Sequence, residues 1–126
     1  MKSVVTAAAA PAAIGPYSHA VISNGFLFSS GQIGVDPATG EMAGPDAGAQ
    51  TRQCLANLDA VLRAAGLGPG NVVRVNVHLA DMADFAAMNE EYKRYFPGDF
   101  PARCCVAVGA MALGARVEID LVASLG

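Results

Sequence analysis

Two charged residues stand inside apolar segments near the C-terminus. The stretch "FPARCCVAVGAMALGARVEIDLV", residues 100–122, reads as two apolar strands joined by a Gly/Ala loop, with Arg103 in the first and Glu118 in the second. A guanidinium presents a planar fork of donors that binds a carboxylate through two hydrogen bonds. A carboxylate in apolar surroundings is either a salt-bridge partner or a base that activates water. From the residues alone, a structural ion pair and a functional site are equally compatible with this pattern.

Strand alternation predicts which side chains share a face with each charge. Arg103 falls with Cys105 and Ala107, opposite Cys104 and its alternate neighbours. Glu118 falls with Asp120 on the polar face of its own strand, flanked by apolar residues on the other face.

The elements that position these residues follow from hydrophobic periodicity and turn residues. The pair Asn24-Gly25 separates two β-rich runs, which predicts a hairpin of strands at 17–23 and 26–31. Apolar residues at helical spacing predict one helix over 47–65, stopped by Gly66, and a second that begins near an Asp81 cap and ends at Pro97. The run "NVVRVNVHLA" alternates and predicts a strand with Val73, Val75, Val77 and Leu79 on one face.

Together with a short strand at 3–6, the order is β-β-β-α-β-α-β-β. Helices embedded among strands predict an α+β fold, a mixed sheet with both helices packed on one face. The length of 126 residues predicts a single domain spanning 1–126. The other face of the sheet mixes polar and small residues and needs solvent or a partner, for which a homo-oligomer is the simplest solution.

Composition excludes several classes of function. The net charge is −3 and no basic stripe occurs, so nucleic-acid binding is poorly supported. No apolar run reaches 18 residues, which argues against a membrane span. The first residues lack the Leu-rich core of a signal peptide and Pro11 interrupts their alanines, so we expect a cytosolic protein.

The cysteines and histidines do not form a recognisable metal site. Three cysteines without a secretory signal do not predict a disulfide framework, and adjacent Cys104 and Cys105 point to opposite faces of a strand. Cys54 is expected to be a small buried hydrophobe. His19 is expected at the surface beside Ser18, and His78 on the polar face of its strand. We therefore expect no metal site.

Four segments together resemble one family. The segments are "APAAIGPYSHAV" (10–21), "SSGQIGVDPATGE" (29–41), "AAMNEEYKRYF" (86–96) and "FPARCCVAV…RVEID" (100–120). In this order and spacing, the chain resembles the reactive intermediate deaminase (Rid/YjgF) family over essentially its whole length. The resemblance implies a chorismate-mutase-like α+β domain that forms a homotrimer with active sites at the subunit interfaces. It also implies hydrolysis of 2-imino acids, such as 2-iminopropanoate and 2-iminobutanoate, to 2-keto acids and ammonia. We expect this reaction to need no metal or organic cofactor, because an imine is already electrophilic.

The resemblance also implies roles for individual residues. Arg103 of "PARCC" would bind the substrate carboxylate, and Glu118 of "VEI" would activate water. The backbone of Cys105 would contact the imine nitrogen. The remaining cleft positions fall on Tyr17, Ser30, Gly31 and Asn89. The sequence departs from the family pattern at His19, where glutamine is more usual, and near Met111, where the loop lacks a common Leu-Pro.

Other classes of function stay open at this point. Some relatives are described as translation inhibitors with ribonuclease activity, which the acidic composition disfavours here. Others resemble non-catalytic ligand-binding or chaperone-like modules, in which Arg103 would bind a keto or amino acid and Glu118 would brace it. A member of pyrimidine catabolism acting on a different enamine is a further alternative.

Overall fold

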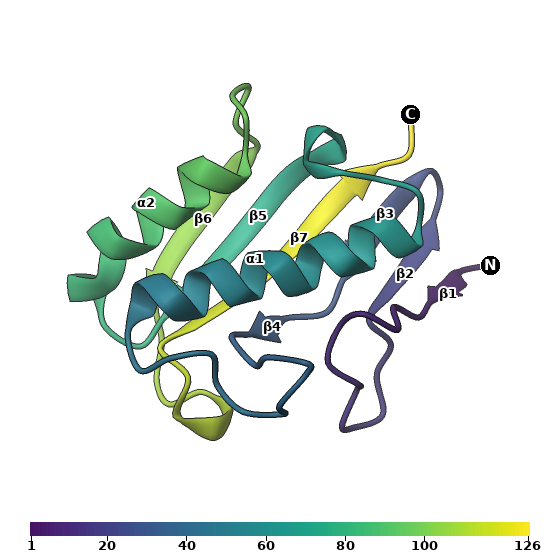
Figure 1. Ribbon diagram of the computed structural model, residues 1–126. Coiled ribbons are helices and arrows are strands. Elements are labelled where there is room, and N and C mark those ends of the chain that lie inside the picture. Colours follow the sequence, from purple (N-terminus) through teal and green to yellow (C-terminus); the bar gives the residue numbers. More distant parts are fainter.

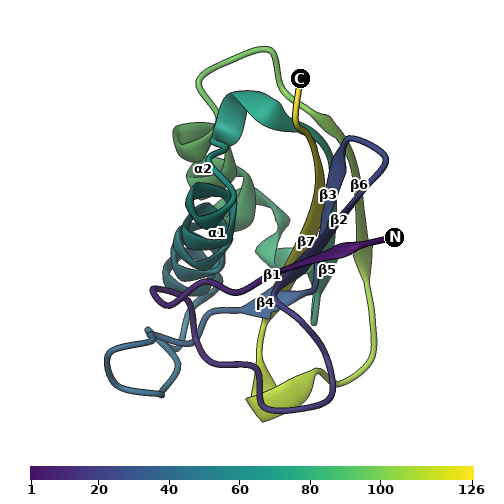
Figure 2. The same ribbon diagram turned by 90° about the vertical axis from the view of Figure 1, so that its right-hand side faces the viewer.

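Two helices lie on one face of a single β-sheet in the computed structural model, which describes residues 1–126 (Figures 1 and 2). The helices are α1 (Ala47–Ala64) and α2 (Phe85–Tyr95). The strands are β1 (Ser3–Val5), β2 (Ala20–Ser23), β3 (Phe26–Ser29), β4 (Gln32–Ile33), β5 (Val72–Leu79), β6 (Ala102–Ala107) and β7 (Val117–Ser124). The predicted α+β class, a mixed sheet with both helices on one face, is confirmed.

The sheet runs in the order β1-β2-β3-β7-β5-β6. All neighbouring strands are antiparallel except β5 and β6, which are parallel because α2 carries the chain back between them. Strand β7 pairs with β3 along its C-terminal half and with β4 along its N-terminal half. Strand β6 is therefore one edge of the sheet, and Glu118 on β7 lies two strands inward.

The hairpin forms at Asn24-Gly25, but both of its strands are shorter than predicted. Asn24 and Gly25 adopt φ of 51° and 81°, as a tight hairpin turn requires. Strand β2 starts only after His19, because that side chain is turned inward to hold the preceding loop. Its Nδ1 accepts a hydrogen bond from the Ala7 N–H at 3.0 Å, and its Nε2 donates to the Pro11 carbonyl at 2.7 Å. The prediction that His19 lies at the surface is wrong, since it is only 6% exposed.

Helix α1 forms over the predicted range and also anchors the loops at one end of the sheet. Asp46 caps it by accepting from the Ala49 N–H at 2.8 Å, and Gly66 follows its end with φ of 76°. Asn57 donates to the backbone carbonyls of Ile33 and Val35, at 3.3 and 2.9 Å. Because β4 has only two residues, these bonds help to hold it beside β7.

Strand β5 and helix α2 each differ from the prediction in one detail. A bulge at Val73 breaks the pairing of β5 with β7, so Val73 is exposed while Val75 is fully buried. Asp81 caps a 3-10 turn over Met82–Asp84, and α2 begins only at Phe85. The predicted helix start is therefore three residues early.

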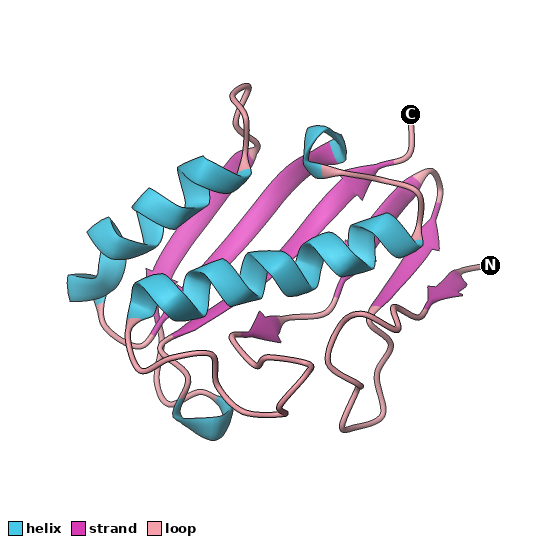
Figure 3. Cartoon of the chain, in the orientation of Figure 1, coloured by secondary structure: helices cyan, strands magenta, loops and turns pink.

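The core lies between the helices and the sheet, and the opposite face of the sheet is open (Figure 2). Exposed apolar side chains lie on three strands of the open face: Val4 on β1, Phe26 and Phe28 on β3, and Val106 on β6. Asn76 donates to Asp120 on this face at 2.9 Å. Figure 3 shows the loops before β2, after β4 and between β6 and β7 gathered at one end of the sheet. Neither helix combines the length and apolar character needed to cross a bilayer.

Candidate active site

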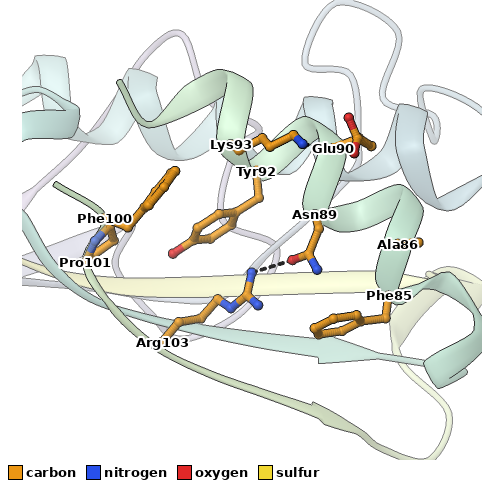
Figure 4. Close-up of a pocket in the computed structure, with 9 residues that line it drawn as sticks. All are labelled: Phe85, Ala86, Asn89, Glu90, Tyr92, Lys93, Phe100, Pro101 and Arg103. Atoms are coloured by element: carbon orange, nitrogen blue, oxygen red, sulfur yellow. Dashed lines mark hydrogen bonds and ion pairs between the residues drawn. The ribbon is translucent and has the colours of Figure 1, made fainter. Parts of the chain in front are cut away.

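Arg103 lies beneath helix α2, in a pocket of about 650 Å³ that we call the Arg103 pocket (Figure 4). Its Nη1 donates to Asn89 Oδ1 at 2.6 Å. Its guanidinium carbon lies 4.7 Å from the ring centre of Tyr92 and 5.5 Å from that of Phe85. These cation–π contacts and the hydrogen bond orient the guanidinium. The Nη2 and Nε donors have no partner in the chain, so they are available to an anion.

The sequence builds this pocket from one helix face and one edge strand. Phe85, Asn89 and Tyr92 recur at intervals of four and three residues, which places them on the same side of α2. In the parallel pairing of β6 with β5, Arg103 is opposite Val75. Val75 is buried under the helices, so Arg103 on the same row also points toward α2.

Glu118 lines a different pocket of about 420 Å³, at the end of the sheet where the loops gather. We call this the Glu118 pocket; its lining includes Pro11, Ile14, Tyr17, Gly31, Leu113 and Glu118. The Glu118 carboxylate lies against Gly31, and a Cβ at position 31 would come within 2.9 Å of Glu118 Oε2. Gly31 therefore makes room for the carboxylate by lacking a side chain.

Tyr17 and Ser30 lie on the Glu118 side of the molecule. Tyr17 is 46% exposed and forms part of the pocket wall. Ser30 Oγ donates to the Ser18 carbonyl at 2.6 Å, and the Ser30 N–H donates to the His19 carbonyl at 3.0 Å. Ser30 thus holds the backbone next to Tyr17, and it does not line the pocket itself.

Arg103 and Glu118 point to opposite faces of the sheet. Arg103 faces the helices, as its pairing with Val75 shows. On β7, Glu118 lies between Val117 and Ile119, which are both fully buried, and it is opposite His78 on β5. Because successive side chains of a strand point to opposite faces, Glu118 faces away from the helices. Strand β5 separates the two strands that carry them, which puts the strand axes about 10 Å apart. Within one chain, the predicted site residues therefore form two groups.

An ion pair between Arg103 and Glu118, one of the two interpretations left open by the sequence, is wrong within a single chain. The ion pairs of the structure involve other residues. Arg103 donates to the neutral Asn89 amide oxygen, and the Glu118 carboxylate lies beside Gly31. Each charge thus lacks a counterion in its own chain.

Cys105 lies on the Arg103 side, and its thiol is partly buried against the core. Burial raises the pKa of this thiol, while Arg103 acts in the opposite direction. Burial also raises the pKa of the fully buried Cys54 far above its usual range. Both thiols therefore stay protonated at neutral pH, which does not favour a nucleophilic cysteine. Strand β6 is an edge, so part of its backbone is free to bind a ligand or another chain.

The sequence did not predict the two aromatic rings at Arg103. Met88 and Tyr92 on α2 are both buried, but Tyr92 also lines the Arg103 pocket. The signal that could have revealed this is the position of the site candidate Asn89, one helical turn from both Phe85 and Tyr92.

Fold and pockets together define a small α+β protein with a cationic pocket under its second helix and an acidic pocket at the end of its sheet. The family model described as Endoribonuclease L-PSP matches residues 7–125. A 2-iminobutanoate/2-iminopropanoate deaminase from goat (Capra hircus) is 44% identical over 126 residues, covering 100% of this chain and 92% of the relative.

Two further relatives extend the comparison. A RutC family protein from Pyrococcus horikoshii is 46% identical over 123 residues, covering 98% of both chains. The crystal structure of E. coli TdcF with bound serine has a TM-score of 0.92 and 37% identity, covering 97% of this chain and 98% of the other. The chain belongs to the Endoribonuclease L-PSP family, the Rid/YjgF family that its motifs resemble, and that prediction is confirmed.

Proposed function

We propose that this protein hydrolyses small 2-imino acids, such as 2-iminopropanoate and 2-iminobutanoate, to 2-keto acids and ammonia. The observation that carries the proposal is the Arg103 guanidinium, oriented by Asn89 and two rings and left without a carboxylate partner. Such a fork suits the carboxylate of a small acid. Full-length relatives at 44% identity are named deaminases of these two substrates, which supports the same chemistry here.

We infer that the complete site forms between two copies of the chain. A small imino acid cannot contact Arg103 and Glu118 of one chain, because the sheet lies between them. The edge position of β6 and the exposed apolar side chains of the open face favour association with further copies. We propose a homotrimer, as the family resemblance implies, in which the Arg103 pocket of one subunit meets the Glu118 pocket of the next.

In this arrangement, Arg103 binds the substrate carboxylate and positions the imine carbon. Glu118 takes a proton from water as the water oxygen bonds to that carbon, and the C=N double bond becomes a single bond to nitrogen. Return of that proton to nitrogen gives a carbinolamine with one hydroxyl and one amino group. The hydroxyl proton then passes to nitrogen as the C–N bond breaks and the C=O bond forms, which releases ammonia and leaves the 2-keto acid. A general base of this kind contributes about 10²–10⁴-fold in rate.

The other candidates assist in or beside the two pockets. The Cys105 backbone contacts the imine nitrogen, while Asn89 holds the guanidinium through its amide oxygen. Tyr17 forms a wall, Gly31 leaves space for Glu118, and Ser30 fixes the backbone beside Tyr17. On the family resemblance alone, we propose the cytosol as the location.

The test couples an amino-acid oxidase to this protein and follows the released imine by trapping it as a semicarbazone. Wild-type protein should accelerate imine loss and reduce trapping. Arg103→Ala should abolish most of this effect, whereas the matched control Arg63→Ala, which removes an exposed guanidinium paired with Asp59 on α1, should not. Imine decay that wild-type protein does not change would refute the proposed activity.

A second candidate function is small-ligand binding without catalysis. The bound serine in the TdcF structure favours it, because serine also carries a carboxylate and a nitrogen on the next carbon. In that case Arg103→Ala would abolish binding of 2-oxobutanoate, while wild-type protein would leave the imine decay rate unchanged.

A further inference from the structure

Leu113 is an exposed leucine in a backbone conformation that is unfavourable for its side chain. Its φ of 56° and ψ of 25° lie in the left-handed region, and the residue is 69% exposed. The other non-glycine residues with positive φ are Asn24 and Asp99, whose short polar side chains tolerate this region. A leucine in this conformation destabilises the fold and, so exposed, buries little apolar surface in return. Its side chain therefore requires an explanation outside folding.

Leu113 lines the Glu118 pocket from the loop between β6 and β7. It is part of the short 3-10 turn Ala112–Gly114, at the end of the sheet where the loops gather (Figure 3). Ile14, from the loop before β2, lines the same pocket and is 84% exposed. Two large apolar side chains that are far apart in the sequence thus border the pocket that holds the candidate base.

The Glu118 pocket suits an apolar group and not a second anion. Glu118 is the only carboxylate in its lining, and no lysine, arginine or histidine lines it. A ligand carboxylate in this pocket would have no cation to bind and would be repelled by Glu118. Leu113 and Ile14 instead lose water-exposed apolar surface when another apolar group covers them. At about 420 Å³, the pocket has room for more than a methyl or ethyl group.

The connectivity of a 2-imino acid brings its side chain to this pocket. Carbon 2 carries the carboxylate, the imine nitrogen and the side chain. In the proposed function Arg103 holds the carboxylate, and Glu118 directs water to carbon 2. Because the side chain is bonded to that same carbon, it begins beside Glu118 and extends into the space that the Glu118 pocket provides.

We propose that Leu113, assisted by Ile14, is a specificity-determining residue that binds the substrate side chain. The protein then favours 2-imino acids with larger apolar side chains, such as the one derived from leucine, over 2-iminobutanoate. It discriminates against 2-imino acids whose side chain carries a carboxylate. The inference rests on the proposed function for the position of carbon 2.

The test compares wild-type protein with Leu113→Asn by calorimetric titration, because asparagine adopts the left-handed region more readily and removes the apolar contact. Wild-type protein should bind 4-methyl-2-oxopentanoate about tenfold more tightly than 2-oxobutanoate, as expected for two further buried carbons. It should bind 2-oxoglutarate more weakly than either. In Leu113→Asn the preference for 4-methyl-2-oxopentanoate should fall to within about threefold, with 2-oxobutanoate affinity within about twofold of wild type. The melting temperature should be unchanged or higher.

Leu125→Asn is the matched control, because Leu125 is also exposed, at 41%, and lines neither pocket. This variant should keep the wild-type preference. Equal wild-type affinity for the two apolar keto acids would overturn the inference, as would an unchanged preference in Leu113→Asn. Sedimentation adds a third outcome: loss of the wild-type oligomer in Leu113→Asn would mean that a second copy covers the leucine, which also overturns the inference.

Failure of the proposed activity is distinguishable from failure of this inference. The activity is read from imine decay in the presence of wild-type protein, whereas the side-chain preference is read from keto-acid binding. A protein that leaves imine decay unchanged and still loses its preference in Leu113→Asn would keep the side-chain subsite and lose only the catalytic role.

Discussion

Arg103 and Glu118 face opposite sides of the same sheet, Arg103 beneath α2 and Glu118 against Gly31, which directly precedes β4. Neither side chain forms an ion pair in the chain. The two charges are therefore presented separately, one in each pocket. Under the proposed function, a single small ligand would meet both charges only where two chains come together.

Replacing Gly31 should displace the Glu118 carboxylate without unfolding the protein. The added Cβ of Gly31→Ala would lie 2.9 Å from Glu118 Oε2, which is the mobile end of its side chain. We expect kcat to fall about 10- to 100-fold, because a base moved by about 1 Å no longer holds water in line. Gly70→Ala is the control, since no atom lies within 4 Å of the added Cβ. Unchanged kcat in Gly31→Ala would argue against a catalytic Glu118.

His19 should be replaceable by glutamine but not by leucine. Its ring accepts from the Ala7 N–H and donates to the Pro11 carbonyl, and a glutamine amide offers the same pair of functions. His19→Leu leaves both backbone groups unpaired, so we expect a loss of about 1–3 kcal/mol in the free energy of unfolding. Denaturant unfolding measures the difference. If both variants were equally unstable, the two hydrogen bonds would not explain the burial of His19.

The ion pairs of Glu91 on the outer face of the helices should stabilise the folded protein at neutral pH and lose this effect in acid. Glu91 accepts two hydrogen bonds from Arg52, each 3.1 Å, and one from Arg94 at 2.9 Å. The Arg52 hydrogen bonds are the main cause that holds the pKa of Glu91 below its usual value. A lowered folded-state pKa means that this stability is present above the unfolded value of about 4.3 and is lost as pH falls further.

Glu91→Gln should therefore melt on the order of 2–4 °C below wild type at pH 7. The gap should narrow as the pH falls below the unfolded value of about 4.3, because the wild-type carboxylate is then progressively protonated. Thermal melts at several pH values make the comparison. A gap that stays constant across this range would mean that packing, and not charge, makes Glu91 stabilising.

Local features of the fold were predictable because neighbouring residues determine them. The Asn24-Gly25 turn, the Gly66 stop of α1 and the alternation of β7 all follow from short-range rules. The inward turn of His19 was not predictable in this way. It depends on Ala7 and Pro11, which lie 12 and 8 residues away and come close only in the folded chain.

The individual site residues could be predicted from the sequence, but their separation into two pockets could not. Alternation assigned a face to Arg103 within β6 and to Glu118 within β7, each relative to its own neighbours. Which faces coincide depends on the strand order and on the parallel pairing of β6 with β5. Strand order and strand pairing depend on residues that are far apart in the sequence, so local patterns do not predict them. The separation of the two charges is therefore visible only in the folded sheet.

The most direct test of a site shared between subunits mixes two inactive variants. Arg103→Ala and Glu118→Gln should each be inactive alone. After co-refolding in equal amounts, every mixed trimer contains one interface that joins an intact Arg103 to an intact Glu118, so roughly a quarter of wild-type imine hydrolysis should return. Co-refolded trimers, verified by sedimentation, that stay inactive would contradict the shared site and require both residues to act from one chain.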